Sequence, residues 1–167
     1  MNSVVIALLT IVINLIITIS AAYVFSKKKF RLKKALFGIN EMALMFVATA
    51  VSIPRYIVIQ KTGLIDTWAA HILPMLAMPV GLFLVKQFVD QIPDALIEAA
   101  IMDGAKDFRI IQKIIVPLTL PALSTTVVLT FQSVWSATEA SNNFITNDTM
   151  RTLAFYLNSL ITNNMVS

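Results

Sequence analysis

The chain has 167 residues, of which 57% are hydrophobic and 13% charged; its mean hydropathy is +0.80 and its net charge is +4. An average soluble domain has about 25% charged residues, so this composition excludes an ordinary soluble domain. Cysteine is absent, which excludes disulfides and thiolate-bound metals. Because a helix needs about 20 apolar residues to cross a bilayer, and several runs here approach that length, we expect an all-α membrane protein.

The first predicted span is the uncharged run at 4–24, which contains one polar amide, Asn14. As a helix it reaches about 30 Å, the thickness of the hydrocarbon core. A secretory signal peptide is the alternative, but its basic residues would precede the apolar region, whereas here they follow it. The six lysines and arginines of the loop at 27–34 adjoin this span, which favours an anchor against anionic lipid over a nucleic-acid site.

Three further spans are predicted, at about 35–60, 67–89 and 117–135. Glu41, near the start of the second span, is expected at the membrane interface, because a carboxylate deeper in the membrane is costly. His71, the only histidine, has no predicted metal partner and is expected to be a packing residue. Hydroxyl side chains along the fourth span either bond to helix carbonyls or face a polar path. Asn14, Thr125 and Thr130 are candidates for lining such a path, but the sequence assigns no substrate-binding residue.

Lysine and arginine are unevenly distributed among the segments that join these spans. Ten of the 13 lie in 27–34 and 86–116, which four spans in series place on one side of the membrane. The positive-inside rule makes that side cytoplasmic, so the stretch at 90–116 is predicted to be cytoplasmic and the polar tail at 136–167 external. Almost nothing precedes the first span, and the tail resembles a loop before a returning span. We therefore expect a fragment that lacks one helix at each end.

The cytoplasmic stretch at 90–116 has the pattern of two short helices. The first is predicted from Asp94 to Met102, after Pro93, a residue suited to the start of a helix. Gly104 permits a sharp turn, and the second helix runs to about Val116. The second helix is expected to have an apolar stripe of Phe108, Ile111, Ile114 and Ile115 and a basic face of Lys106, Arg109 and Lys113.

The first of these helices has a shape suited to a groove on a partner protein. Asp94 and Glu98 share a polar face, and the small side chains of Ala99, Ala100 and Ala105 leave room for a closely approaching surface. Apolar residues can share one side in two ways, as Leu96, Ala99 and Ala100 or as Ile97, Ala100 and Ile101. An amphipathic loop that lies on the lipid headgroups is the alternative, and physical considerations alone do not choose between the two.

Seven positions of this stretch match a known pattern at fixed spacing: Glu98, Ala99, Ala100, Gly104, Ile114, Val116 and Pro117. The pattern resembles the EAA motif of the permease subunits of ABC importers, with Val116 where leucine is commoner. The flanking residues at 63–69, 86–93 and 152–153 are similar to carbohydrate importers of the maltose-permease type. The resemblance covers about 35–160, and the six core spans of that family agree with the expected loss of one helix at each end.

The resemblance implies a multi-pass permease subunit of the cell membrane in an ATP-driven importer for sugars or oligosaccharides. The implied partners are a second homologous permease subunit, two ATP-binding cassette ATPase subunits, an extracellular solute-binding protein and the lipid bilayer, with no nucleic acid, metal or cofactor. The subunit would not itself be an enzyme, which fits the absence of a phosphate-loop pattern. The implied ATPase-docking residues are Glu98, Ala99, Ala100, Asp103, Gly104, Ala105, Ile114 and Pro117.

Within this set, Glu98 would face a basic group in a cleft of the ATPase, and Ala99 and Ala100 would pack closely against the cleft. Closure of the ATPase on ATP would pull the helix and switch the path between inward- and outward-facing states. Two alternatives stay open: a truncated or non-transporting membrane anchor that binds an ATPase, and an importer permease for a non-sugar solute. A membrane enzyme is disfavoured, because no nucleophile arrangement or convergent set of carboxylates occurs in the spans.

Overall fold

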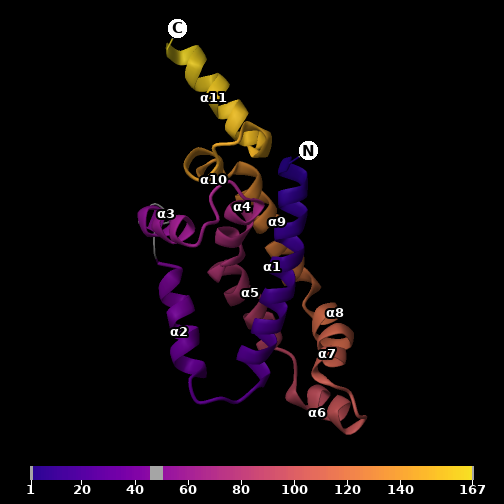
Figure 1. The fold of residues 1–167 in the computed structure, drawn as a ribbon. Helices are drawn as coiled ribbons and strands as arrows, with labels where there is room; N and C mark the ends of the chain where they lie inside the picture. Colours follow the sequence, from indigo (N-terminus) through magenta and orange to yellow (C-terminus); the bar gives the residue numbers. More distant parts are fainter. Residues whose placement is uncertain (1, 46–50, 167) are drawn as a thin grey trace. The chain divides into compact units, whose positions relative to one another are not determined.

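The computed structural model describes residues 2–45 and 51–166 of the chain, and every regular element in this described part is a helix (Figure 1). The prediction of an all-α protein is therefore confirmed. The chain divides into two compact units, which are described separately below. One unit contains the described residues of Met1–Val12, Val47–Ala77 and Thr130–Ser167, and the other contains those of Ile13–Phe46 and Met78–Leu129.

Helix α1 (Asn2–Lys27) is long and apolar enough to cross a membrane by itself. Such a helix satisfies all its backbone groups internally, as the lipid environment requires. Two pairs of helices joined at a bend, Trp68–Leu76 with Pro79–Asp90 and Asp107–Leu118 with Leu120–Asn143, raise the number of candidate spans in the described part of the chain to three. They overlap the spans predicted at 4–24, 67–89 and 117–135, and the bounds and number of the spans stay predictions.

The span predicted at 35–60 corresponds to two separate helices, α2 (Lys33–Ala43) and α3 (Ser52–Lys61). Residues 46–50, which would join them into one span, lie outside the described residues. The total of four spans stays a prediction.

In the unit of Ile13–Phe46 and Met78–Leu129, α2 packs against α5 (Pro79–Asp90). The rings of Phe37 and Phe83 stack with centroids 6.3 Å apart, and Asn40 donates a hydrogen bond of 3.2 Å to the carbonyl oxygen of Pro79. Val85, Val89, Tyr23 and Ile115 belong to the core of this unit. The second half of α1 therefore shares a core with α5 and with the segment before Pro117.

The same unit contains the predicted pair of short helices, α6 (Asp94–Met102) and α7 (Asp107–Ile110). The chain then continues through the π-helix η2 (Ile111–Ile115) and α8 (Val116–Leu118). In η2 the amide of Val116 reaches back five residues to the carbonyl of Ile111. Pro117 has no amide hydrogen and would crowd an α-helical turn before it, so a wider π-turn at this point is physically reasonable.

Helix α9 (Leu120–Ser136) follows after a bend of 84°. The bend falls at Thr119, whose buried hydroxyl donates a hydrogen bond of 2.8 Å to the carbonyl oxygen of Ile115. The same carbonyl also accepts the regular helical bond from the amide of Thr119 at 3.0 Å, so the hydroxyl is a second donor to it beside the bend.

The other unit contains α3, α4 (Trp68–Leu76), α10 (Glu139–Asn143), the short 3₁₀ helix η3 (Asp148–Met150) and α11 (Leu153–Val166). Helix α4 packs against α10 around a core that includes Ile59, Ala70 and Phe144. Arg55 and Glu139 form an ion pair of 2.6 Å, and His71 is buried. The segment predicted as a polar tail thus contains a helix, α11, and packs in part against the loop and helices before it.

Candidate partner-docking site at the turn between α6 and α7

Helix α6 presents two different faces. Asp94 lies in its first turn, where a carboxylate is favourable beside the positive end of the helix dipole. Ile97 is buried and Ala100 is partly buried, and both pack against the core of the unit. Leu96 and Ile101 are exposed, so neither predicted grouping faces inward as a whole. The inward side consists of Ile97 and Ala100.

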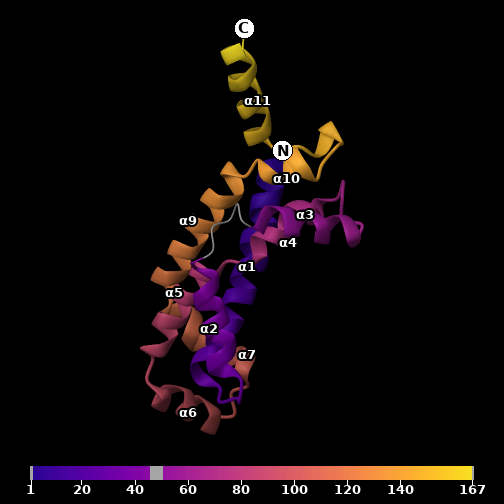
Figure 2. The same cartoon turned by 90° about the vertical axis from the view of Figure 1, so that its left-hand side faces the viewer.

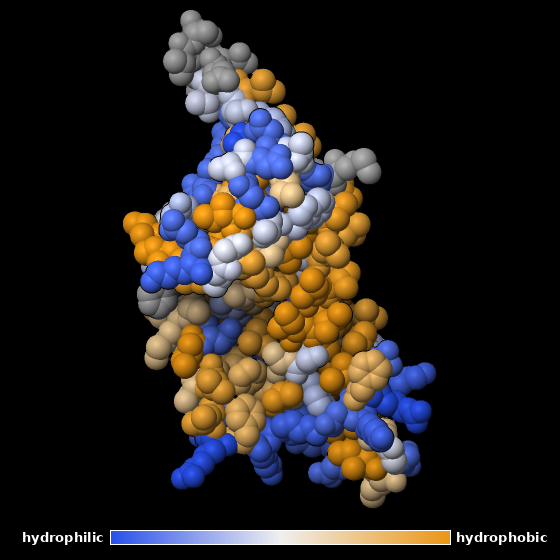
Figure 3. All heavy atoms as spheres, in the orientation of Figure 1, coloured by the Kyte–Doolittle hydropathy of each residue, from blue (hydrophilic) through white to orange (hydrophobic). Residues whose placement is uncertain are grey.

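The outer face of α6 combines acidic, small and apolar side chains. Glu98, Ala99 and Asp103 are exposed, and Met102 is 83% exposed. Figures 1 and 2 both show α6 and α7 at the end of this unit where α1 terminates. In Figure 3 hydrophobic spheres over α6 are bordered by hydrophilic ones. This mixture of an exposed apolar patch with a carboxylate fits a protein-binding face better than a fully solvated helix.

The members of the apolar stripe predicted for the second helix do not share one environment. Phe108 is 72% exposed, whereas Ile110 is 1% exposed and belongs to the core. Helix α7 begins only at Asp107, and the inward positions that follow are Ile110, Ile111, Ile114 and Ile115. Phe108 consequently projects from the same outer region as Met102, and a hollow of about 380 Å³ beside it is lined by Gly104, Lys106, Phe108 and Arg109.

The turn between the helices is closed by backbone hydrogen bonds. Gly104 has φ +78°, a left-handed conformation that glycine adopts without the strain of a β-carbon. Its amide bonds to the carbonyl of Ile101 at 2.9 Å, and the amide of Ala105 bonds to the carbonyl of Ala100 at 2.9 Å. These are the two bonds of the Schellman motif, and the apolar contact that accompanies it is supplied by Ala100 and Ala105.

The predicted docking residues therefore fall into two groups. Glu98, Ala99, Asp103 and Gly104 are exposed together on α6 and its turn. Ala100, Ala105 and Ile114 are partly buried and pack against the core, and Pro117 is exposed in α8, beyond the π-helix. Ala100, Ala105 and Ile114 thus pack the two helices against the core, and the docking role of the whole set stays a prediction.

Half of the basic residues in the loop after α1 have polar partners within this unit, and the anchor against anionic lipid stays a prediction. Lys27, Lys28 and Lys33 form polar contacts inside the unit, whereas Lys29, Arg31 and Lys34 are exposed. Lys27 lies 2.7 Å from Asp94, and Lys28 lies 2.7 Å from Asp107. Hydrogen bonding to Lys27 holds the pKa of the Asp94 carboxyl below its usual value, and hydrogen bonding to Lys28 does the same for the pKa of Asp107. Both carboxylates thus stay charged at neutral pH.

Residues 14–165 match the protein family described as the binding-protein-dependent transport system inner membrane component. The chain belongs to this family. The prediction of an ABC importer permease from the EAA pattern is thereby confirmed at the level of the family. The inner membrane component named by the family agrees with the apolar helix α1.

Individual relatives agree with this assignment. The chain is 35% identical over 137 residues to the trehalose transport system permease protein SugB of Mycobacterium tuberculosis, covering 81% of this chain and 50% of SugB. It is 34% identical over 140 residues to the osmoprotective compounds uptake permease protein GgtD of a Synechocystis species, covering 81% of this chain and 46% of GgtD. The chain thus spans about half the length of these curated relatives.

A solved structure also matches. A chain of a bacterial ABC transporter involved in the import of the acidic polysaccharide alginate has a TM-score of 0.89 and 26% sequence identity; the match covers 97% of this chain and 57% of that one. The helical arrangement is therefore that of an ABC transporter membrane subunit. Within residues 2–45 and 51–166, no group of three or more histidine or acidic side chains could hold a metal ion.

The candidate path residues of this inner membrane component do not share one environment. Asn14 and Thr130 are buried, whereas Thr125 is exposed and its hydroxyl donates a hydrogen bond of 3.0 Å to the carbonyl of Pro121. Bonds of the same kind are made from α9 by Ser124 and Thr126. For these three hydroxyls the structure favours bonding back to the helix over facing a polar path.

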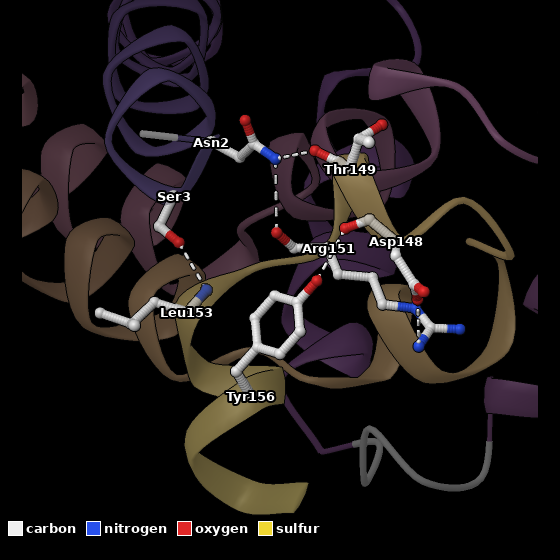
Figure 4. A pocket seen from close by; sticks show the side chains of 7 residues that line it. All are labelled: Asn2, Ser3, Asp148, Thr149, Arg151, Leu153 and Tyr156. Atoms are coloured by element: carbon white, nitrogen blue, oxygen red, sulfur yellow. Dashed lines mark hydrogen bonds and ion pairs between the residues drawn. The ribbon is translucent and has the colours of Figure 1, made fainter.

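A polar pocket of about 330 Å³ lies in the other unit, between the start of α1 and the segment from η3 to α11 (Figure 4). Its polar groups bond largely to one another. The side-chain amide of Asn2 donates to the carbonyl of Thr149, the Ser3 hydroxyl accepts from the amide of Leu153 at 2.8 Å, and the Tyr156 hydroxyl donates to the carbonyl of Asp148 at 2.8 Å. The first two contacts connect segments 147 and 150 positions apart, so they fix the start of α1 to the segment from η3 to α11.

Proposed function

We propose that the protein is a membrane-spanning permease subunit of an ATP-driven importer, and that the α6–α7 turn is its docking site for an ATPase. The observation that carries this proposal is the exposed face on which Glu98, Ala99 and Met102 lie together next to the closed turn at Gly104. A short helix with small side chains and one carboxylate fits a groove that contains a basic group. The chain belongs to a family of inner membrane components of binding-protein-dependent transport systems, which supports the assignment as a permease subunit.

In the proposed mechanism, closure of an ATPase dimer on ATP moves the docked α6, and the membrane helices switch the path between inward- and outward-facing states. This coupling requires two global states that the docked element biases. Two ATPase subunits, a second homologous permease subunit and an extracellular solute-binding protein complete the proposed assembly. Glu98 faces a basic group of the ATPase, and Ala99 allows the close approach of its surface.

The proposed location is the cell membrane, with several crossings and with α6 and α7 in the cytoplasm. Exposed basic side chains support this side for the α6–α7 end: Lys29, Arg31, Lys34, Lys106, Arg109 and Lys113. All six belong to the unit that contains the docking face. Such a concentration of lysine and arginine is typical of cytoplasmic segments next to a membrane.

A sugar or oligosaccharide is the proposed solute. The names of the trehalose permease and of the alginate importer support this class. The name of the permease for osmoprotective compounds, at nearly the same identity, specifies no chemical class, and a non-sugar solute is the second candidate. Uptake of labelled trehalose, an acidic oligosaccharide and a zwitterionic osmolyte by the assembled transporter would distinguish these classes.

The docking proposal is tested by Glu98→Lys in the full-length permease, assembled with its partners in lipid vesicles. We expect normal membrane insertion, loss of co-purifying ATPase and loss of uptake, because the reversed charge would repel the basic group of the cleft. Glu41→Lys, which makes the same charge change at an exposed position on α2, is the matched control and should retain the ATPase. Normal uptake by the Glu98 variant would refute the docking role. ATPase binding without uptake by the unaltered transporter would favour the non-transporting anchor.

A further inference from the structure

The C-terminal end of α1 contacts both helices of the docking pair through side chains. Three of its residues take part: Tyr23 and Lys27 in the last turns of α1 and Lys28 directly after it. Their partners are the first residue of α6, Asp94, and the first residue of α7, Asp107. All five residues belong to the same compact unit.

Lys27 fixes the beginning of α6. Its side chain is only 6% exposed, and its ammonium lies 2.7 Å from the Asp94 carboxylate and also donates to the backbone carbonyl of Ile92. A nearly buried ammonium is stable only when such partners are in place. Lys27 therefore connects α1 both to α6 and to the short loop that leads into it.

Lys28 and Tyr23 fix the beginning of α7. The Asp107 oxygen Oδ1 lies 2.7 Å from the Lys28 ammonium and accepts a hydrogen bond of 2.9 Å from the Tyr23 hydroxyl. The Tyr23 side chain is buried in the core of the unit, so its hydroxyl presents a fixed donor to Asp107. The ion pair alone is largely exposed and would be weak, whereas the buried tyrosine makes the contact directional.

The backbone segments that connect α6 and α7 to the neighbouring helices are irregular. On one side α6 is joined to α5 through the non-helical residues 91–93, and on the other side α7 runs through the π-helix Ile111–Ile115 to the 84° bend at Thr119. Loops and irregular helical turns are the positions where hinges commonly form. The pair is also held by Ile97 and Ile110, which are buried in the core that it shares with α1 and α5. The contacts from α1 add fixed polar partners at the first residue of each helix.

We propose that Tyr23, Lys27 and Lys28 are positioning residues that make the α6–α7 pair move as one body with the C-terminal end of α1. The proposal rests on the docking function argued above and adds the route by which motion of the docked pair reaches α1. Asp94 lies four residues before Glu98, whereas Asp107 lies between Lys106 and Phe108, which line the hollow beside the turn at Gly104. The amount of co-purified ATPase therefore has to be measured to separate anchoring from docking.

The test uses charge exchange in the assembled full-length transporter. The single variants are Lys27→Glu, Asp94→Lys, Lys28→Glu and Asp107→Lys, and the matched double variants exchange the charges within each pair; Lys27→Arg is the conservative control. Two quantities are measured: hydrogen exchange of the backbone amides in 94–110, and the number of solute molecules imported per ATP hydrolysed. The co-purified ATPase is quantified for each variant.

We expect the single variants to retain the ATPase and to raise amide exchange. The rise should be about two- to fivefold for the partly exposed Lys28–Asp107 pair and larger for the Lys27–Asp94 pair, whose ammonium is nearly buried. Import per ATP should fall, because the docked pair would move without α1. Each double variant and Lys27→Arg should recover both quantities at least in part. Singles with unchanged exchange and unchanged import per ATP, or double variants without any recovery, would overturn the proposal.

Failure of the docking function is recognised separately. If Glu98→Lys keeps the ATPase and normal uptake, the docking proposal fails, whatever the anchoring variants do. The exchange measurement still judges the anchoring in that case, because it reports how the pair is held and does not depend on which protein binds its face.

Discussion

The backbone amide of Ala105 donates a hydrogen bond of 2.9 Å to the carbonyl oxygen of Ala100, and this bond closes the end of α6. The bond requires the left-handed conformation of Gly104 between the two alanines. It gives a physical reason for Gly104 and the partly buried Ala100 in the pattern: together with Ala105 they build the turn that ends the helix on which Glu98 and Ala99 are exposed.

Gly104→Ala should destabilise the turn by about 1–2 kcal/mol, the cost of a left-handed conformation for a residue with a β-carbon. A β-carbon at Gly104 would meet no atom within 4 Å, so the cost is conformational and not steric. Gly104→Asn should be milder, because asparagine tolerates this conformation. Amide exchange in 94–107 is the measurement. Gly38→Ala in α2, where a β-carbon also meets nothing within 4 Å and φ is not positive, should have little effect; equal effects at both glycines would contradict the explanation.

Phe108 and Ile110 are two positions apart and should respond in opposite ways to truncation. Phe108→Ala should change the stability of the protein by less than about 0.5 kcal/mol, because its side chain is exposed. It should nevertheless weaken ATPase binding roughly tenfold if the ring is an anchor of the docking face. Ile110→Ala should cost about 2–5 kcal/mol, since it leaves a cavity in the core. Thermal unfolding in detergent and titration of the ATPase separate the two effects, and normal ATPase affinity of the Phe108 variant would exclude the ring from the interface.

Gly81 allows α5 to approach α9 closely. A β-carbon at this position would lie 3.0 Å from the Cγ2 methyl group of Thr126, which is buried. Gly81→Ala should therefore destabilise the unit by about 1 kcal/mol, and Gly81→Leu by about 3 kcal/mol, as overpacked cores do. Adding Thr126→Ser to Gly81→Ala removes the methyl group and should restore part of the loss. If the double variant were less stable than the sum of the single effects predicts, steric conflict between these two groups would not be the cause.

Asp66 connects two loops of the other unit. Its carboxylate accepts hydrogen bonds from the amide and the hydroxyl of Thr146 and from the amide of Asn147 at 3.1 Å, and its own amide donates to Phe144. The hydroxyl of Thr146, followed by the amides of Asn147 and Thr146, holds the pKa of Asp66 below its usual value. Because the pKa is lower in the folded state, the contribution of Asp66 to stability is present above the ordinary carboxyl pKa of about 4 and is lost as the pH falls through the folded-state value.

We expect amide exchange at 144–147 to accelerate as the pH is lowered below about 4, after correction for the intrinsic pH dependence of exchange. Asp66→Asn, which tolerates the observed φ of +56° but cannot titrate, should remove this acceleration and leave exchange faster at neutral pH. Thr146→Val is the control on the partner side and should reduce the pH effect only in part. A pH response that persists in the asparagine variant would assign it to another group.

Part of the candidate site could be predicted because the signals for it are local. The bounds of α6 agree with the helix predicted from Asp94 to Met102, since Pro93 and Gly104 mark its two ends within one short stretch. Which residues of the second helix are buried could not be predicted as well. Its inward stripe depends on where α7 begins after the turn and on the π-helix at Ile111–Ile115, and neither has a reliable sequence signal. The predicted apolar stripe therefore included Phe108, which is exposed, and missed Ile110, which lies in the core.

By itself the sequence determined that the protein is helical and membrane-embedded, that a glycine turn joins two short helices, and that these helices carry the pattern of an importer permease. Composition, apolar run length and residue spacing are sufficient for this, because helices and turns form from neighbouring residues. Only the tertiary structure decided that Lys27 and Lys28 hold the beginnings of α6 and α7, with partners 67 and 79 positions away. The lysines of a basic loop look alike in sequence, and which of them meet carboxylates depends on how distant helices pack.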